Sequence, residues 1–270
     1  MSTFYTRYRE RRERIRSVLC VGLDPDPDQL PGGYDKTDAG LLQHLEDIIE
    51  STADVALAYK PNAAFFESRG AGGWGMLHAT IEKIRKAAPE ALVILDAKRG
   101  DLGNTASHYA KAVFDELNAD AVTLNPYMGR ESLEPFLERS DRCSFVLCLT
   151  SNTGARDLQY HGDPPLFERV ARLCHEWNQQ TNNLGLVVGA TRKGSELQRV
   201  RELAPDLPFL VPGVGRQGGD LDSVMEMAGK DVLVNSSRSI LFASHKRENL
   251  VESARQEAQS LLDSMQKYLS

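Results

Sequence analysis

The chain has 270 residues, of which 41% are hydrophobic and 26% charged, and its formal net charge is −6. This composition is ordinary for a soluble globular enzyme. The negative balance argues against nucleic acid as a partner, because a basic face is needed to neutralise phosphates. No apolar run approaches the roughly 18 residues of a membrane span, so we expect no membrane partner and a cytoplasmic location.

Residues 1–16 are rich in arginine but also carry Glu10 and Glu13. Transit peptides are poor in acidic residues, so this segment does not resemble one. We expect an amphipathic helix that closes one end, the bottom, of the folded domain. The first strand is expected directly after it.

Short apolar runs then recur along the chain, each followed by a polar or Gly/Pro-bearing turn. Continuously apolar runs are typical of a parallel sheet that is covered on both faces. The eight predicted strands are Val18–Leu23, Val55–Lys60, Leu92–Lys98, Ala121–Asn125, Phe145–Thr150, Gly185–Gly189, Phe209–Pro212 and Asp231–Asn235.

Helical stretches lie between these runs, and the clearest are Ala39–Ser51, Gly75–Ala88, Thr105–Asn118, Pro165–Gln180 and Asp220–Ala228. Eight β-then-α units in a chain of this size predict an α/β fold, a (β/α)8 TIM barrel. We see no linker, so we expect one domain over residues 1–270. The alternative is a doubly wound open sheet, which the lack of a GxGxxG motif after an early strand disfavours.

The four cysteines, Cys20, Cys143, Cys148 and Cys174, form no CxxC motif, and the six histidines form no HExxH motif. We therefore expect buried free thiols, a reducing compartment and no structural metal.

The C-terminal ends of barrel strands are where such enzymes gather their chemistry. Asp24 follows the first run, Lys60 ends the second, Ser151 follows the fifth and Arg238 follows the eighth. The third run ends in the segment 96–101, DAKRGD, which carries four charges. Charges at strand ends favour an active site over a set of solvated turns.

Asp96 and Lys98 are two residues apart on one strand, so their side chains share a face. If that face lines the barrel interior, two opposite charges lie side by side in a poorly solvated place. Burying such charges costs several kcal/mol unless they are paired, which makes this a candidate functional site. The alternative is a structural ion pair at a strand end.

The segment 96–105, DAKRGDLGNT, resembles the DxKxxD signature of orotidine 5′-monophosphate decarboxylases. Its DAKRGD form is similar to that of the bacterial branch with longer chains. Further blocks agree in order along the chain, namely GLDPD at 22–26, YKPN at 59–62, NPYMG at 125–129, TSN at 150–152, VGAT at 188–191, PGVGRQGG at 212–219 and SRSI at 237–240. A single DxKxxD motif would be weak, because related sugar-phosphate enzymes share it. One block at each strand end makes a specific match.

The resemblance implies cofactor-free decarboxylation of orotidine monophosphate to uridine monophosphate by an array of alternating charges, Lys60, Asp96, Lys98 and Asp101. It implies that Lys98 protonates C6 of the pyrimidine and that Asp96 lies beside the substrate carboxylate. Asp24 and Lys60 would hold ribose hydroxyls, and Ser151 the ring. Asp101 and Thr105 would come from the second subunit of a homodimer.

The predicted fold also indicates where a phosphate group of the substrate would bind. Barrels often bind phosphate on the loops after strands 7 and 8, where this chain has Gly215, Gly218 and Arg238. Glycines let backbone N–H groups approach an anion, and an arginine fork fits phosphate oxygens. Simple turn glycines and a surface arginine are the alternative. The resemblance places Arg238 on the phosphate and has Gln217 bridge from it toward the base.

Three other functions remain open. One is a sugar-phosphate lyase or synthase on the same barrel that uses the acidic residues for magnesium. The second is a Schiff-base aldolase using Lys98, which flanking carboxylates disfavour because they keep the amine protonated. The third is a non-catalytic nucleotide-binding protein, which would have no use for a costly charge cluster.

Overall fold

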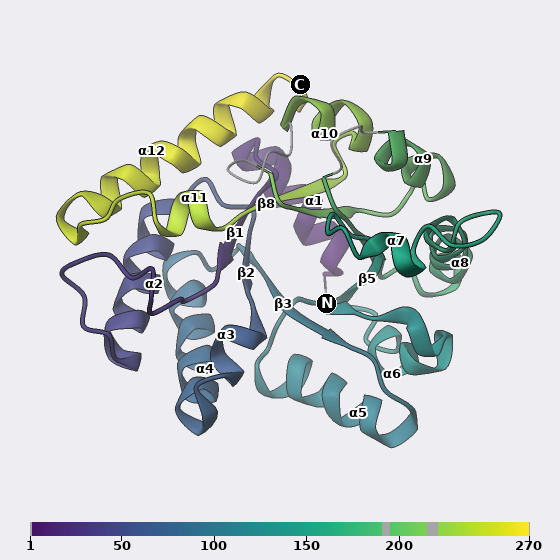
Figure 1. The fold of residues 1–270 in the computed structure, drawn as a ribbon, viewed down its shortest axis with the longest axis horizontal. Coiled ribbons are helices and arrows are strands. Elements are labelled where there is room, and N and C mark those ends of the chain that lie inside the picture. Colours follow the sequence, from purple (N-terminus) through teal and green to yellow (C-terminus); the bar gives the residue numbers. More distant parts are fainter. Residues whose placement is uncertain (1, 191–194, 215–220, 270) are drawn as a thin grey trace.

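The computed structural model describes residues 2–190, 195–214 and 221–269. Its eight parallel strands follow each other around a closed barrel in chain order, and β8 pairs with β1 (Figure 1). The strands are β1 (Leu19–Leu23), β2 (Ala58–Pro61), β3 (Leu92–Arg99), β4 (Ala121–Leu124), β5 (Cys143–Leu149), β6 (Leu184–Val188), β7 (Phe209–Pro212) and β8 (Val232–Ser236). The prediction of a (β/α)8 barrel is confirmed, because an open doubly wound sheet would leave two unpaired edges.

Helices surround the barrel on its outside (Figure 1). The α-helices are α1 (Phe4–Ile15), α2 (Asp38–Thr52), α3 (Ala63–Glu67), α4 (Gly70–Ala87), α5 (Gly103–Lys111), α6 (Glu134–Leu137), α7 (Ala155–Leu158), α8 (Leu166–Thr181), α9 (Ser195–Leu203), α10 (Leu221–Ala228), α11 (Arg238–Leu241) and α12 (Arg247–Gln266). A π-helical turn, η1 (Ala112–Glu116), extends α5, and the 3-10 turns η2 (Pro126–Met128) and η3 (Arg130–Ser132) follow β4. Among the described helices, none is long and apolar enough to cross a membrane.

Helix α2 shows how the local sequence sets these elements. Thr37 caps its N-terminus, where the side-chain oxygen accepts a hydrogen bond from the Gly40 N–H at 3.2 Å. Leu41, Leu45 and Ile48 recur at helical spacing and are fully buried. The helix therefore forms where a polar cap precedes one continuous apolar face, and that face holds it against the barrel.

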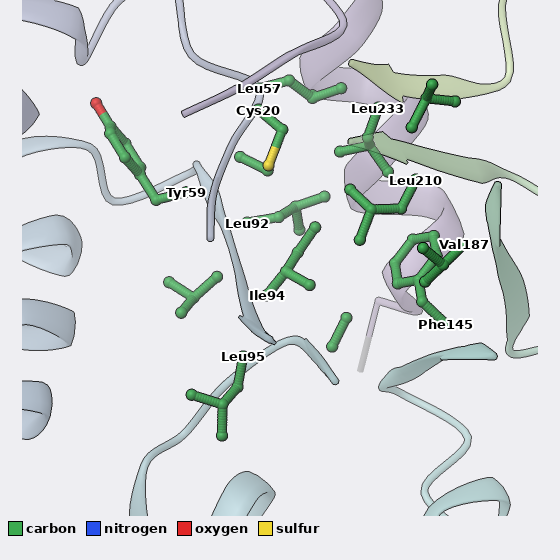
Figure 2. Close-up of a cluster of buried hydrophobic side chains, with 14 of the residues drawn as sticks. Cys20, Leu57, Tyr59, Leu92, Ile94, Leu95, Phe145, Val187, Leu210 and Leu233 are labelled. Carbon is green, nitrogen blue, oxygen red and sulfur yellow. The ribbon is translucent and has the colours of Figure 1, made fainter. Parts of the chain in front are cut away.

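The interior of the barrel is a packed apolar layer beneath a polar one. Figure 2 shows Ile94 of β3 gathered with Cys20, Leu210 and Leu233 from other strands. Tyr59 points away from this group, and its hydroxyl donates to the Ile49 carbonyl of α2 at 2.9 Å. Side chains alternate along a strand, so the position after Ile94 on the inner face is Asp96. The charged residues therefore stand directly above the apolar core.

Helix α1 contacts the strands at their N-terminal ends. The Tyr8 hydroxyl donates to the carbonyl of Val232, the first residue of β8, at 3.0 Å. The buried Arg11 guanidinium donates to the Ala56 carbonyl, just before β2, at 2.8 Å through Nη2. Phe4 packs edge to face on Phe145 of β5. This helix lies at the end of the barrel opposite the charged residues.

Candidate active site

Three charged side chains meet where β2 and β3 end. Lys60 Nζ donates to Asp96 Oδ2 at 2.8 Å, and Lys98 Nζ donates to Asp96 Oδ1 at 2.6 Å. One carboxylate therefore lies between two ammonium groups that approach its two oxygens separately. The alternating order Lys60–Asp96–Lys98 is the order that the sequence predicted for these three residues.

The array is buried on the Lys60 side and open on the Lys98 side. The side chains of Lys60 and Asp96 are 5% and 12% exposed, whereas that of Lys98 is 50% exposed. Burial by itself would raise the pKa of Asp96, but the charges and hydrogen bonds of Lys60 and Lys98 outweigh it and hold this pKa well below its ordinary value. Burial would likewise lower the pKa of Lys60, but Asp96 and Asp24 raise it above its ordinary value. Asp96 and Lys60 are therefore both ionised at neutral pH.

Lys98 reaches Asp96 through an irregular end of β3. The pairing of β3 with β4 shifts register between Leu95 and Arg99, and Lys98 has a φ of 47°, in the left-handed region. That conformation costs a non-glycine residue of the order of 1–3 kcal/mol and persists only where neighbours hold it. Strain of this kind is characteristic of functional sites.

Thr123 of β4 is the neighbour that holds this turn. Its Oγ1 accepts hydrogen bonds from the Ala97 and Lys98 N–H groups, both at 3.0 Å, and donates to Asp96 Oδ1 at 2.9 Å. The hydroxyl is itself buried. One side chain therefore fixes both the backbone of Lys98 and the carboxylate that Lys98 contacts.

A cavity of about 440 Å³ opens beside Lys60 and Asp96. Four of the predicted site residues line it: Asp24, Lys60, Asp96 and Arg238. Its other walls are Asp26, Gln29, Asn62, Phe65, Pro212, Gly213, Val214, Asn235, Ser236, Ser237, Ser239 and Phe242. The cavity thus reaches from Lys60 and Asp96, at the ends of β2 and β3, to Arg238 after β8.

Asp101, Thr105 and Ser151 are not among the residues that line this cavity. Asp101 Oδ1 accepts a hydrogen bond from the Leu102 N–H at 2.7 Å, at the start of α5, and Thr105 is exposed on that helix. Ser151 is exposed after β5. Gln217, Gly215 and Gly218 lie outside the described residues. A single chain thus brings together the Lys60, Asp96 and Lys98 part of the array without Asp101.

Two further polar residues of the site carry too weak a signal in the sequence to be predicted. Thr123 lies in an apolar strand where threonine is an ordinary β-branched residue. Asn235 of β8 lines the cavity and is only 6% exposed. The only signal in the sequence for Asn235 was a polar amide side chain at the end of an apolar run. Within the described residues, no cluster of three or more His, Cys, Asp or Glu side chains could hold a metal ion.

Comparisons with known proteins agree with this geometry. Residues 17–252 match the model of the Orotidine 5'-phosphate decarboxylase / HUMPS family. A protein named orotidine 5'-phosphate decarboxylase in Herpetosiphon aurantiacus is 48% identical over 263 residues, 96% of each chain. One of the same name in Roseiflexus castenholzii is 45% identical over 260 residues, 93% of each chain.

A solved structure matches over the same extent. It is the OMP decarboxylase of Leishmania donovani, with a TM-score of 0.84 and 39% identity, covering 98% of this chain and 99% of that one. Family model, relatives and fold agree over nearly the whole chain. The chain belongs to the orotidine 5'-phosphate decarboxylase / HUMPS family.

Proposed function

We propose that this chain decarboxylates orotidine 5′-monophosphate to uridine 5′-monophosphate, in the de novo synthesis of pyrimidine nucleotides, without a cofactor. The observation that carries the proposal is the Lys60–Asp96–Lys98 array beside a cavity that reaches Arg238. A protein that only binds a nucleotide gains nothing from a carboxylate placed between two ammonium groups at the reacting end. Relatives named for this activity at 45–48% identity support the same assignment.

Lys98 is the proton donor in this account. The C6–carboxylate bond breaks, carbon dioxide leaves, and the electron pair stays on C6, where the ring cannot delocalise it well. The Lys98 ammonium stabilises this charge as it develops and then gives its proton to C6. Its 50% exposed side chain can afterwards regain a proton from water.

Asp96 acts in two ways. It is ionised, and its two oxygens accept from Lys60 and Lys98, so it fixes both amines. It also places negative charge beside the substrate carboxylate, a repulsion that disappears when carbon dioxide leaves. Asp24 and Lys60 hold ribose hydroxyls, and Ser151 holds the pyrimidine ring.

The phosphate binds at the Arg238 end of the cavity. Arg238 is exposed at the first residue of α11 and lines the cavity, so its guanidinium can meet phosphate oxygens. Gln217 bridges the phosphate and the base, and the backbone at Gly215 and Gly218 approaches the anion. These three residues lie outside the described part of the chain, so their assignment depends on the sequence alone.

The active unit is a homodimer in which Asp101 and Thr105 enter the partner's site. Within one chain, Asp101 bonds the neighbouring Leu102 N–H. The end of β3 and the segment after β4 are joined by a hydrogen bond from the Asn125 N–H to the Arg99 carbonyl at 2.7 Å. The segments that follow these two strands, including α5 and η2, expose large apolar side chains, Leu102, Tyr109, Tyr127 and Met128, which a second copy would cover.

The proposal also covers the domain organisation and the location of the protein. Residues 1–16 close the bottom of a single domain that spans residues 1–270, which the contacts of α1 with the N-terminal strand ends support. The protein acts in the cytoplasm and takes neither nucleic acid nor membrane as a partner.

The test is a spectrophotometric assay of orotidine monophosphate with purified protein, in the presence and absence of EDTA. The proposal expects consumption of the substrate at the same rate in both. Loss of activity with EDTA would favour the magnesium-dependent sugar-phosphate lyase or synthase. A preparation of the Lys98→Ala variant, purified in the same way, controls for contaminating host enzyme.

A further inference from the structure

The strongest unexplained feature of the cavity is the side chain of Asn235. It is 6% exposed, lines the cavity, and its Oδ1 has no hydrogen-bond partner among the described residues. Its Nδ2 donates to Ser237 Oγ at 3.3 Å, which leaves the oxygen as the free atom. A buried amide oxygen without a donor is energetically costly, so such atoms are rare in folded proteins.

The position of Asn235 on β8 directs it toward the ligand. Leu233, two residues earlier, lies in the core inside the barrel (Figure 2). Side chains alternate along a strand, so Asn235 is on the same inner face, where it lines the cavity. Asn235 pairs in register with Cys20 of β1 on one side and with Pro212 of β7 on the other. Asn235 therefore stands between β1, which leads to Asp24, and β7, and it comes three residues before Arg238 in the chain.

Gly22 of β1 leaves the room that this arrangement needs. A Cβ atom on Gly22 would lie 1.8 Å from Ser237 Oγ and 3.3 Å from Asn235 Oδ1. Any larger residue at 22 would thus expel the Ser237 hydroxyl that holds Asn235. The wall of the cavity is built around the Asn235–Ser237 pair.

A second acceptor in the same cavity is also unsatisfied. Asp24 Oδ1 is buried and has no hydrogen-bond partner among the described residues. Two unsatisfied acceptors call for a ligand that brings donors. Neither the phosphate nor the carboxylate of orotidine monophosphate carries a donor at neutral pH. Between its phosphate and its ring, the ribose hydroxyls are the only donors.

We propose that Asn235 is a substrate-positioning residue whose amide oxygen accepts a hydrogen bond from one ribose hydroxyl. This inference deepens the proposed function and depends on it for the identity of the ligand. It assigns to β8 a share in holding the sugar, in addition to the predicted Asp24 and Lys60. The same bond lets the protein discriminate ribose from a deoxyribose.

The test pairs the Asn235→Ala variant with deoxy substrates. With orotidine monophosphate we expect kcat/KM to fall roughly tenfold, the size expected for one lost hydrogen bond. One of the two deoxy substrates, 2′-deoxy or 3′-deoxy, lacks the bonded hydroxyl. With that substrate, kcat/KM of the variant should be within about twofold of the wild-type value. Equal losses on all three substrates, or no loss on any, would overturn the proposal.

Asn183 provides the matched control. It is also buried, at 1% exposed, and its Oδ1 likewise has no partner among the described residues, but it precedes β6 at the opposite end of the barrel. Asn183→Ala should lower the midpoint of thermal unfolding and change kcat/KM by the same factor on all three substrates. If Asn235→Ala does not fold, Asn235→Ser removes the amide oxygen with a smaller loss of volume and takes its place.

A binding measurement separates this inference from the proposed activity. Calorimetry with uridine monophosphate and its two deoxy forms needs no turnover. Asn235→Ala should weaken binding of uridine monophosphate roughly tenfold and leave one deoxy form unaffected. If wild type and Asn235→Ala differ in binding in this way, but wild type does not consume orotidine monophosphate, the decarboxylase assignment is rejected. The role of Asn235 in holding the sugar then stays intact.

Discussion

The hydroxyl of Thr123 accepts a hydrogen bond from the backbone N–H of Lys98 at 3.0 Å, and so β4 fixes the reactive residue of β3. The same oxygen accepts from the Ala97 N–H and donates to Asp96 Oδ1. Lys98 needs this support because its φ of 47° is unfavourable for a lysine. The irregular end of β3 is therefore part of the chemistry, since a regular strand would aim this amine elsewhere.

Thr123→Val tests this support. The change keeps the shape of the side chain but leaves two backbone N–H groups without their acceptor and removes one of the two donors to Asp96 Oδ1. The lost hydrogen bonds are worth about 1–3 kcal/mol, so we expect kcat to fall roughly tenfold or more. KM should change little. Thr123→Ser retains the hydroxyl and should keep most of the activity. A valine variant with wild-type kcat would remove Thr123 from the account.

Asp96 should contribute pH-dependent stability. Its pKa is lowered in the folded protein, so its contribution is complete above the unfolded value of about 3.9 and is lost as the pH falls toward the folded pKa. At pH 7, Asp96→Asn should lower the free energy of unfolding by about 3–5 kcal/mol, because Lys60 is left as a buried, unpaired charge. Urea denaturation of both proteins from pH 7 to pH 3 measures this difference.

The difference between wild type and Asp96→Asn should shrink as the pH falls below about 4, because Asp96 takes up a proton there in the unfolded chain while it is still ionised in the folded protein. A difference that is constant over this range would show that the carboxylate charge does not stabilise the fold.

The sequence allowed the strands to be placed well, because a strand buried on both faces needs a continuous apolar run. The starts of two elements differ most from the prediction, and both differences have physical reasons. β2 begins at Ala58 rather than Val55, since Val55 and Ala56 bond back to the end of α2 through the Thr52 carbonyl. Helix α4 begins at Gly70 rather than Gly75.

The early start of α4 follows from tertiary packing. Glycine is a poor helix former, so the sequence predicted that this helix begins only at Gly75. In the fold, a Cβ atom on Gly73 would lie 1.8 Å from the Phe66 carbonyl oxygen of α3. Glycine is required there because the two helices touch, and no local pattern contains that contact.

The site was predictable where charge stood out against an apolar strand. Lys60, Asp96 and Lys98 did so, and the structure places them in contact. Thr123 and Asn235 act through a hydroxyl and an amide that resemble ordinary strand residues. Their roles depend on which strand is the neighbour and on the shifted register of β3, and both are properties of the closed barrel.

Arg238 should act on the phosphate alone. If binding energy from the phosphate helps to organise the reacting end, Arg238→Ala should lower kcat/KM strongly for orotidine monophosphate. The loss should be much smaller for the nucleoside orotidine, which has no phosphate for the arginine to bind. Steady-state kinetics on both substrates measures this, and equal losses would place Arg238 in another role.

Asp101 should complement Lys98 across two subunits. Asp101→Ala and Lys98→Ala, each nearly inactive, are mixed under conditions in which subunits exchange. Random exchange makes about half of the dimers mixed, and each mixed dimer has one native site, so activity should recover toward about a quarter of wild type. If exchange is verified by labelled subunits and activity stays absent, Asp101 acts within its own chain.

The Lys98→Ala variant tests whether the Lys98 ammonium protonates C6. The variant loses both the proton donor and its charge, and general acid catalysis alone is worth roughly 10²–10⁴-fold. We therefore expect kcat for orotidine monophosphate to fall by at least that factor, while the thermal unfolding midpoint and the binding of uridine monophosphate stay close to wild type. A well-folded variant that turns over the substrate within about tenfold of wild type would contradict the account, since even the lower estimate for general acid catalysis is larger.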